Sequence, residues 1–276
     1  MGNWRGITAI LVGLLLSDAA AIAAPACGPY VVGLFEYGVV YYRGDDGRYQ
    51  GVDADLVADL AKRSGCTLNT VLESRARIWS QLADGRLDLT TSAVPTVERE
   101  RYLEFVPYLR SRAFVWLRRE LAGTLPTPEA FLKDPERRLL VLRGITFSAQ
   151  LTQWIEQLRA RHRLIEAADQ PAALRAIKAG RVDAMLVGAT TLSLSRKRDP
   201  ALDEFIAQDW APQDRVLIGL ALSREKVSLA DRARLRRAMD AMVQDGGLDA
   251  ILRRHLDEAS LRALREPLEP AAGVRP

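Results

Sequence analysis

Residues 82–89 have the sequence LADGRLDL, and residues 177–184 have the similar sequence IKAGRVDA. Each segment contains the end of a helix-like pattern, a glycine, a basic residue and an aspartate that leads into an apolar run. A glycine in this place favours the left-handed backbone that ends a helix, and the apolar run is typical of a strand buried in a parallel sheet. Such a turn also arises by chance in α/β proteins, so the flanking sequence must support a repeated architecture.

The flanking sequence alternates between strand-like and helix-like patterns around both turns. In the first half we predict strands at 30–35, 68–72 and 87–91, with helices at 53–63 and 78–83. In the second half we predict strands at 138–142, 164–167 and 182–187, with helices at 148–161 and 171–179. Alternation of this kind is typical of parallel sheets covered by helices, so we predict an α/β fold with two doubly wound lobes.

The last third of the chain does not begin a third lobe. It contains one strand-like run at 216–222 and helices at 231–244 and 248–256. We expect these elements to return to the first lobe, so that the chain crosses between the lobes twice. The charged, proline-containing residues 259–276 are predicted to be a mobile tail.

The first 26 residues resemble a secretory signal peptide. Arg5 is followed by the apolar run ITAILVGLLL at 7–16 and then by small residues. A run of about ten residues is roughly half of what a membrane-spanning helix needs. We therefore expect export to the periplasm, with cleavage after Ala23 or after Ala26. Cleavage after Ala26 would leave Cys27 at the new terminus and would permit a lipoprotein, although APAC lacks the leucine expected before a lipidated cysteine.

The two cysteines of the 276-residue chain, Cys27 and Cys66, precede two predicted strands. An exported chain with two thiols favours a disulfide between them, and two unpaired thiols are the alternative. The net charge of +4 is spread over the chain with interleaved acids. We therefore expect no nucleic-acid partner.

Catalytic and metal-binding motifs are absent from the sequence. His162 and His255 both lie in arginine-rich helical segments, and no Gly-x-Ser-x-Gly, His-Glu-x-x-His or phosphate-binding glycine loop is present. We therefore predict a protein that is not an enzyme and that needs neither a cofactor nor a metal.

Six segments resemble those of one known family, and they occur in the family's order between about Tyr30 and His255. They are VVGLFEYG at 31–38, GDDGRYQGVDADLVADLAKRSGC at 44–66, IWSQLADGRLDLTTSAVPTVERERYLEFVPYL at 78–109, RGITFS at 143–148, QPAALRAIKAGRVDAML at 170–186 and DGGLDAILRRH at 245–255. The family is family 3 of the bacterial extracellular solute-binding proteins, the polar-amino-acid type.

This resemblance implies a clamshell of two lobes that close on a ligand. We expect lobe 1 at 27–112 and 215–258, lobe 2 at 113–214, and crossings near 111–117 and 211–217. The implied function is periplasmic binding of a small carboxylate-bearing ligand, most simply an amino acid, by a monomer that delivers it to the permease of an ABC importer. Ligands of open α/β sheets lie beyond the carboxyl ends of the strands, which independently supports a site between the lobes.

The resemblance also assigns ligand-binding roles to individual residues. Arg99 matches the arginine of the family's T-x-E-R motif, and its planar guanidinium can give two parallel bonds to one carboxylate. Thr146 is expected to approach from lobe 2, where a glycine turn leads into a helix; a plain helix N-cap is its other possible role, and the two roles do not exclude each other. In the segment after the third strand, Ser92 supplies the side-chain donor. Phe35 and Trp79 are candidate walls of the cleft.

One departure from the family concerns the ligand's amino group. The family often places an acid five residues after the aspartate of the second turn, and this chain has Gly188 there. Either Glu36, an acid in the apolar loop after the first strand, or water binds the ammonium, or the ligand lacks an α-amino group. The resemblance leaves two further functions open: a cyclohexadienyl-dehydratase-like enzyme, for which Glu36 is the candidate acid, and a ligand sensor for a sensor kinase.

Overall fold

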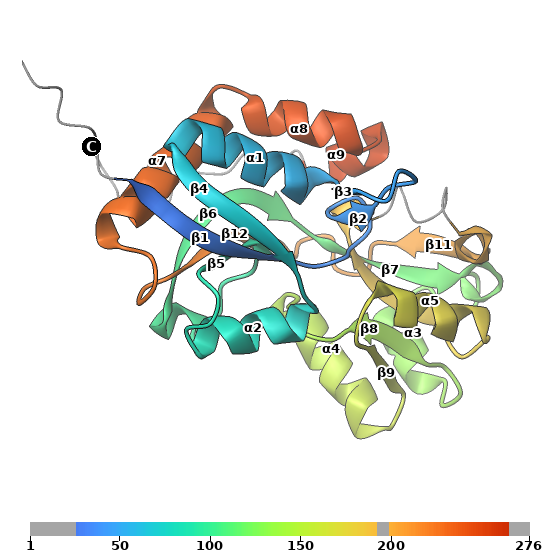
Figure 1. Ribbon diagram of the computed structural model, residues 1–276. Coiled ribbons are helices and arrows are strands. Elements are labelled where there is room, and N and C mark those ends of the chain that lie inside the picture. Colours follow the sequence, from blue (N-terminus) through green and yellow to red (C-terminus); the bar gives the residue numbers. More distant parts are fainter. Residues whose placement is uncertain (1–25, 192–198, 265–276) are drawn as a thin grey trace, which may run out of the picture.

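The computed structural model describes residues 26–191 and 199–264 and shows two five-stranded sheets, each covered by helices (Figure 1). The strand orders are β4-β1-β5-β12-β6 and β11-β7-β10-β8-β9. We call the part built around the first sheet lobe 1 and the part built around the second sheet lobe 2. The prediction of two α/β lobes is confirmed.

Lobe 1 is a three-layer arrangement in which α1, α7 and α8 cover one face of the sheet and α2 lies on the other (Figure 1). Its strands are β1 (Cys27–Leu34), β4 (Cys66–Leu72), β5 (Leu89–Ala93), β6 (Leu103–Ser111) and β12 (Val216–Ser223), with a small hairpin of β2 (Tyr42–Arg43) and β3 (Tyr49–Gln50). Its main helices are α1 (Val52–Ser64), α2 (Arg75–Ala83), α7 (Leu229–Gln244) and α8 (Gly247–His255).

Lobe 2 contains elements that the sequence analysis missed. Its strands are β7 (Ala113–Arg118), β8 (Leu139–Leu142), β9 (Leu164–Ala167), β10 (Ala184–Gly188) and β11 (Phe205–Gln208). Its helices are α3 (Pro128–Lys133), α4 (Ala149–Ala160) and α5 (Gln170–Lys178). The strands β7 and β11 pair antiparallel, and β7 also pairs antiparallel with β10. Residues 113–117, which were expected to link the lobes, are therefore part of a lobe 2 strand.

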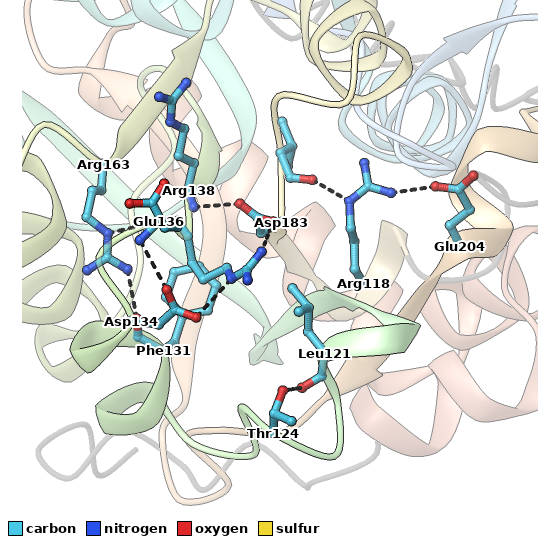
Figure 2. Close-up of polar contacts among 12 residues, drawn as sticks. Arg118, Leu121, Thr124, Phe131, Asp134, Glu136, Arg138, Arg163, Asp183 and Glu204 are labelled. Atoms are coloured by element: carbon cyan, nitrogen blue, oxygen red, sulfur yellow. Dashed lines mark hydrogen bonds and ion pairs between the residues drawn. The ribbon is translucent and has the colours of Figure 1, made fainter.

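In both lobes, the aspartate of the repeated turn accepts a hydrogen bond from the backbone of the neighbouring strand segment. The carboxylate of Asp88 accepts a hydrogen bond from the backbone N–H of Val31 at 2.7 Å, and the carboxylate of Asp183 accepts one from Arg138 at 2.8 Å (Figure 2). Each aspartate thereby fixes the start of its strand against the neighbouring parallel strand, β1 in lobe 1 and β8 in lobe 2. The similarity of the two segments reflects a shared fold.

The chain crosses from lobe 1 to lobe 2 between β6 and β7 and returns between β11 and β12. Arg112 in the first crossing forms an ion pair with Asp209 in the second. This pair ties the two connections together at the hinge.

The predicted mobile tail is wrong for its first residues. Helix α9 (Glu258–Leu264) extends the fold there, because Leu261 and Leu264 bury their side chains in the core. The helix contacts β6 of lobe 1 and the short helix η3 (Ala189–Thr191) that follows β10 in lobe 2. Residues 265–276 lie outside the described part of the chain, as do residues 1–25 of the expected signal peptide.

The disulfide between Cys27 and Cys66 is confirmed. These cysteines are paired neighbours at the start of the parallel strands β1 and β4. The Cys27 sulfur is thus engaged in the bond. Within residues 26–191 and 199–264, no helix has the length and apolar character needed to cross a membrane.

Candidate functional site

A cleft of about 880 Å³, including space open to solvent, lies between the two lobes. Several of its lining residues follow the carboxyl ends of β1 and β5 in lobe 1 and of β8 and β10 in lobe 2. These strand ends meet across the cleft because both sheets point their carboxyl edges toward it. The location agrees with the general placement of ligands in open α/β sheets.

Arg99 lies at the start of the short helix η1 (Arg99–Arg101) and points into the cleft. One of its guanidinium nitrogens donates to the Val94 carbonyl at 3.0 Å and to the Thr146 hydroxyl of lobe 2 at 2.9 Å. Its guanidinium carbon lies 3.6 Å from the centre of the Trp79 ring. Burial lowers the pKa of Arg99. These contacts hold the guanidinium in place and partly shield it from water. Its other N–H groups point into the cleft as donors for a ligand.

Thr146 and Trp79 each form a hydrogen bond between the lobes beside Arg99. The Trp79 ring N–H donates to the carbonyl of Gly144 in lobe 2 at 2.9 Å. Thr146 is not the N-cap of the helix that follows it, because Ser148, two residues later, is the N-cap of α4. Thr146 instead faces the cleft and meets Arg99, so two residues predicted from opposite halves of the chain lie together.

Ser92 is placed at the cleft, but its hydroxyl is not free for a ligand. The hydroxyl donates to Asp53 at 2.9 Å, the N–H donates to the Tyr108 hydroxyl, and the carbonyl accepts from Arg75. These three bonds hold Ser92 at φ 50°, a left-handed conformation that is uncommon for a residue with a side chain. The Ser92 hydroxyl therefore supports the cleft floor through Asp53.

Asp53 is fully buried beneath the cleft floor and accepts hydrogen bonds from the Thr91 and Ser92 hydroxyls. Burial raises its pKa to about 6, against a lowering influence of the two hydroxyls and of Arg75. The folded protein therefore holds the Asp53 proton more tightly than the unfolded chain does.

The free energy of unfolding should fall as the pH rises from about 4 through 6, because Asp53 must ionise in a buried place. Two pKa units correspond to roughly 3 kcal/mol. Denaturant titrations of wild type and Asp53→Asn across this range should show a difference that changes by about 2 to 3 kcal/mol. The exposed Asp84→Asn variant serves as the control. A difference that stays constant with pH would contradict this role of Asp53.

Arg75 is the cleft residue that the sequence analysis missed. It is 4% exposed and begins α2, three residues before the predicted start of that helix. Its guanidinium carbon lies 4.5 Å from the centre of the Phe35 ring and 4.3 Å from that of Trp79. Its N–H groups donate to the Thr90 hydroxyl and to the carbonyls of Thr91 and Ser92. Recognition of Ser74 as the N-cap would have placed this arginine in the first helical turn.

The loop after β1 contributes Phe35 and Tyr37 to the cleft wall, as expected for Phe35. The prediction that Glu36 points into the cleft is wrong. Glu36 lines two neighbouring pockets, one of which shares Phe35 and Arg75 with the cleft, and it interacts with Tyr49. On the lobe 2 side, the Gly188 N–H donates to the Tyr37 hydroxyl at 2.8 Å.

The chain matches the bacterial extracellular solute-binding proteins, family 3, over residues 36–258. It belongs to this family. Over 77 residues the chain is also 35% identical to the cyclohexadienyl dehydratase of Pseudomonas aeruginosa. That match covers 27% of this chain and 29% of the dehydratase.

Solved structures of solute-binding proteins share the fold. An ancestral amino acid-binding protein, described as a precursor of cyclohexadienyl dehydratase, has a TM-score of 0.68 at 21% identity, with 83% of this chain and 95% of that one covered. A substrate-binding protein of an ABC uptake transporter from Streptococcus pneumoniae, with bound histidine, has a TM-score of 0.68 at 16% identity, with 84% and 93% covered. At these identities the likeness establishes the two-lobed fold.

Proposed function

We propose that this family 3 protein binds a small carboxylate-bearing ligand of amino-acid size in the cleft between its lobes. As a periplasmic monomer, it would deliver the unaltered ligand to an ABC importer. The observation that carries the proposal is Arg99, a half-buried guanidinium in the cleft that contacts lobe 2 through Thr146. None of the ion pairs among residues 26–191 and 199–264 includes Arg99, so its charge is left for a ligand.

The binding mechanism follows from the placement of these groups. The ligand first meets lobe 1, where its carboxylate accepts hydrogen bonds from Arg99. Rotation about the two crossings then brings Thr146 and Gly144 over the ligand, and the Trp79–Gly144 bond closes the edge of the cleft. Closure removes water around the carboxylate, which strengthens its bonds to the guanidinium.

A thermal-shift screen of amino acids and small organic acids tests this function. A ligand at a hundredfold excess over its Kd adds about 2.7 kcal/mol to the free energy of unfolding. For a protein of this size, that corresponds to a rise in Tm of about 5 to 10 °C. Stabilisation by amines or sugars, with none by any carboxylate, would contradict the proposal.

The short match to a dehydratase makes enzymatic turnover the second candidate. Such chemistry needs a proton donor in the cleft. Glu36, the acid expected for that role, lines other pockets, and Asp214, which does line the cleft, accepts the hydroxyl of Ser148. We therefore expect tight binding without conversion when the protein is incubated with cyclic carboxylates such as prephenate. Formation of product, followed by chromatography, would establish the enzyme instead.

A further inference from the structure

Arg75 and Arg99 are two cations that share one aromatic ring at the floor of the cleft. Their guanidinium carbons lie 4.3 and 3.6 Å from the centre of the Trp79 ring. Arg75 is 4% exposed, and its hydrogen bonds go to a hydroxyl and two backbone carbonyls, all neutral acceptors. Across residues 26–191 and 199–264, no ion pair includes Arg75. A buried cation normally has an anionic partner.

The position of Arg75 in its helix adds to this imbalance. It is the first residue of α2, whose first turn contains no acidic residue. The amino end of a helix carries a partial positive charge, so a cation there lowers stability and an anion there raises it. Burial, followed by the charge of Arg99, lowers the pKa of Arg75 to about 9, against a raising influence of Asp53 and Tyr108, so Arg75 stays charged at neutral pH. An anion in the cleft that contacts both guanidinium groups would offset this positive charge.

Two carboxylates lie in or beneath the cleft, and each accepts hydrogen bonds from hydroxyl groups. Asp53 lies beneath the floor and accepts the Thr91 and Ser92 hydroxyls. Asp214 lines the cleft and accepts the hydroxyl of Ser148, the N-cap of α4. It is the one Asp or Glu that lines this cleft within the described ranges. An ammonium group next to a carboxylate held by Arg75 and Arg99 would therefore meet two like charges.

Much of the remaining cleft wall is apolar. It includes Val40, Val52, Ile145, Phe147 and Ile218. Such walls stabilise a ligand through burial of hydrocarbon surface and give no compensation for a desolvated ammonium.

We propose that Arg75 and Arg99 together form the anion subsite of the cleft and that the ligand is a carboxylic acid with an apolar body and no ammonium group. This inference rests on the proposed function, and it adds the chemical class of the ligand and a second binding arginine.

Matched pairs of acids test the ligand class. Isothermal titration calorimetry would compare L-phenylalanine with 3-phenylpropionate and phenylpyruvate, and L-leucine with 4-methylpentanoate and 4-methyl-2-oxopentanoate. We expect at least one amine-free acid to bind tenfold or more tightly than its amino acid. Tighter binding of the amino acid in both series would overturn the inference. The inference would also be overturned if other carboxylates bound through Arg99 and none of these amine-free acids bound.

A variant that adds a carboxylate at Gly188 gives a second test of whether the cleft selects against an ammonium group. A Cβ atom there would lie 3.5 Å from the Tyr37 hydroxyl and 3.8 Å from that of Thr190, which are ordinary contact distances. Gly188→Asp adds a carboxylate to the cleft, and Gly188→Asn adds the same shape without the charge. Relative to Gly188→Asn, we expect Gly188→Asp to shift the preference at least tenfold toward the amino acid of each series. An equal preference in the two variants would show that the cleft charge does not select against ammonium.

The role of Arg75 has its own test. Arg75→Lys keeps the charge but not the planar fork, whereas Arg75→Gln removes the charge. We expect affinity for the amine-free acid to fall in the order wild type, Arg75→Lys, Arg75→Gln, with at least a tenfold total loss. Circular dichroism and Tm measurements would confirm that each variant folds. Unchanged affinity in a folded Arg75→Gln variant would remove Arg75 from the subsite. Failure of every carboxylate to bind the wild type would instead reject the proposed function.

Discussion

Replacement of Arg99 by methionine should weaken ligand binding by roughly 30- to 1000-fold, which corresponds to about 2 to 4 kcal/mol. The physical reason is that the carboxylate would lose a charge-assisted donor in a cleft where closure excludes water. Methionine retains the apolar contact with Trp79, so the variant isolates the charge. Calorimetry with the tightest acid from the thermal-shift screen measures the change.

Arg101→Met is the matched control, because Arg101 lies in the same short helix but is exposed to solvent. Its affinity should equal that of the wild type. Arg99→Lys should fall between Arg99→Met and the wild type, since it keeps the charge without the two-pronged geometry. Equal losses in Arg99→Met and Arg101→Met would argue for a general charge effect and against direct contact.

Removal of the disulfide by the double variant Cys27→Ser/Cys66→Ser should lower the free energy of unfolding by about 4 kcal/mol. The two cysteines are 39 residues apart, and the chain-entropy relation gives about this value for a loop of that length. Denaturant titration of the variant, and of the wild type with and without reductant, measures the loss.

Ligand affinity should be unaffected by the same double variant. The disulfide joins the amino ends of β1 and β4, whereas the cleft lies at the carboxyl ends of the strands. A variant as stable as the wild type would contradict the stabilising role of the bond. A folded variant with weakened binding would show that the two ends of the sheet are coupled.

The sequence predicts the fold well where local signals and burial agree. Gly65 ends α1 in a left-handed conformation, and the two aspartates of the repeated turn start parallel strands in both lobes. Periodicity alone fails where tertiary pairing decides the structure. The strands β7 and β11 pair with each other at an edge of the lobe 2 sheet, and α9 becomes ordered through burial of Leu261 and Leu264.

The candidate site is predicted in part for a related reason. Arg99 and Thr146 lie in recognisable motifs, and the structure brings them to 2.9 Å from each other. The direction in which a side chain points is set by its neighbours in three dimensions. Glu36 turns toward Tyr49 rather than into the cleft. The Ser92 hydroxyl turns toward Asp53. Arg75 lies at the cleft because the start of α2 meets the ends of β1 and β5 there.

A crystal structure of the protein with its tightest-binding acid would show whether Arg99 binds the carboxylate between the lobes. We predict that the acid lies between the lobes with its carboxylate oxygens about 2.7 to 2.9 Å from the guanidinium nitrogens of Arg99. An acid bound outside the cleft, or one that presents another group to Arg99, would contradict carboxylate binding by Arg99.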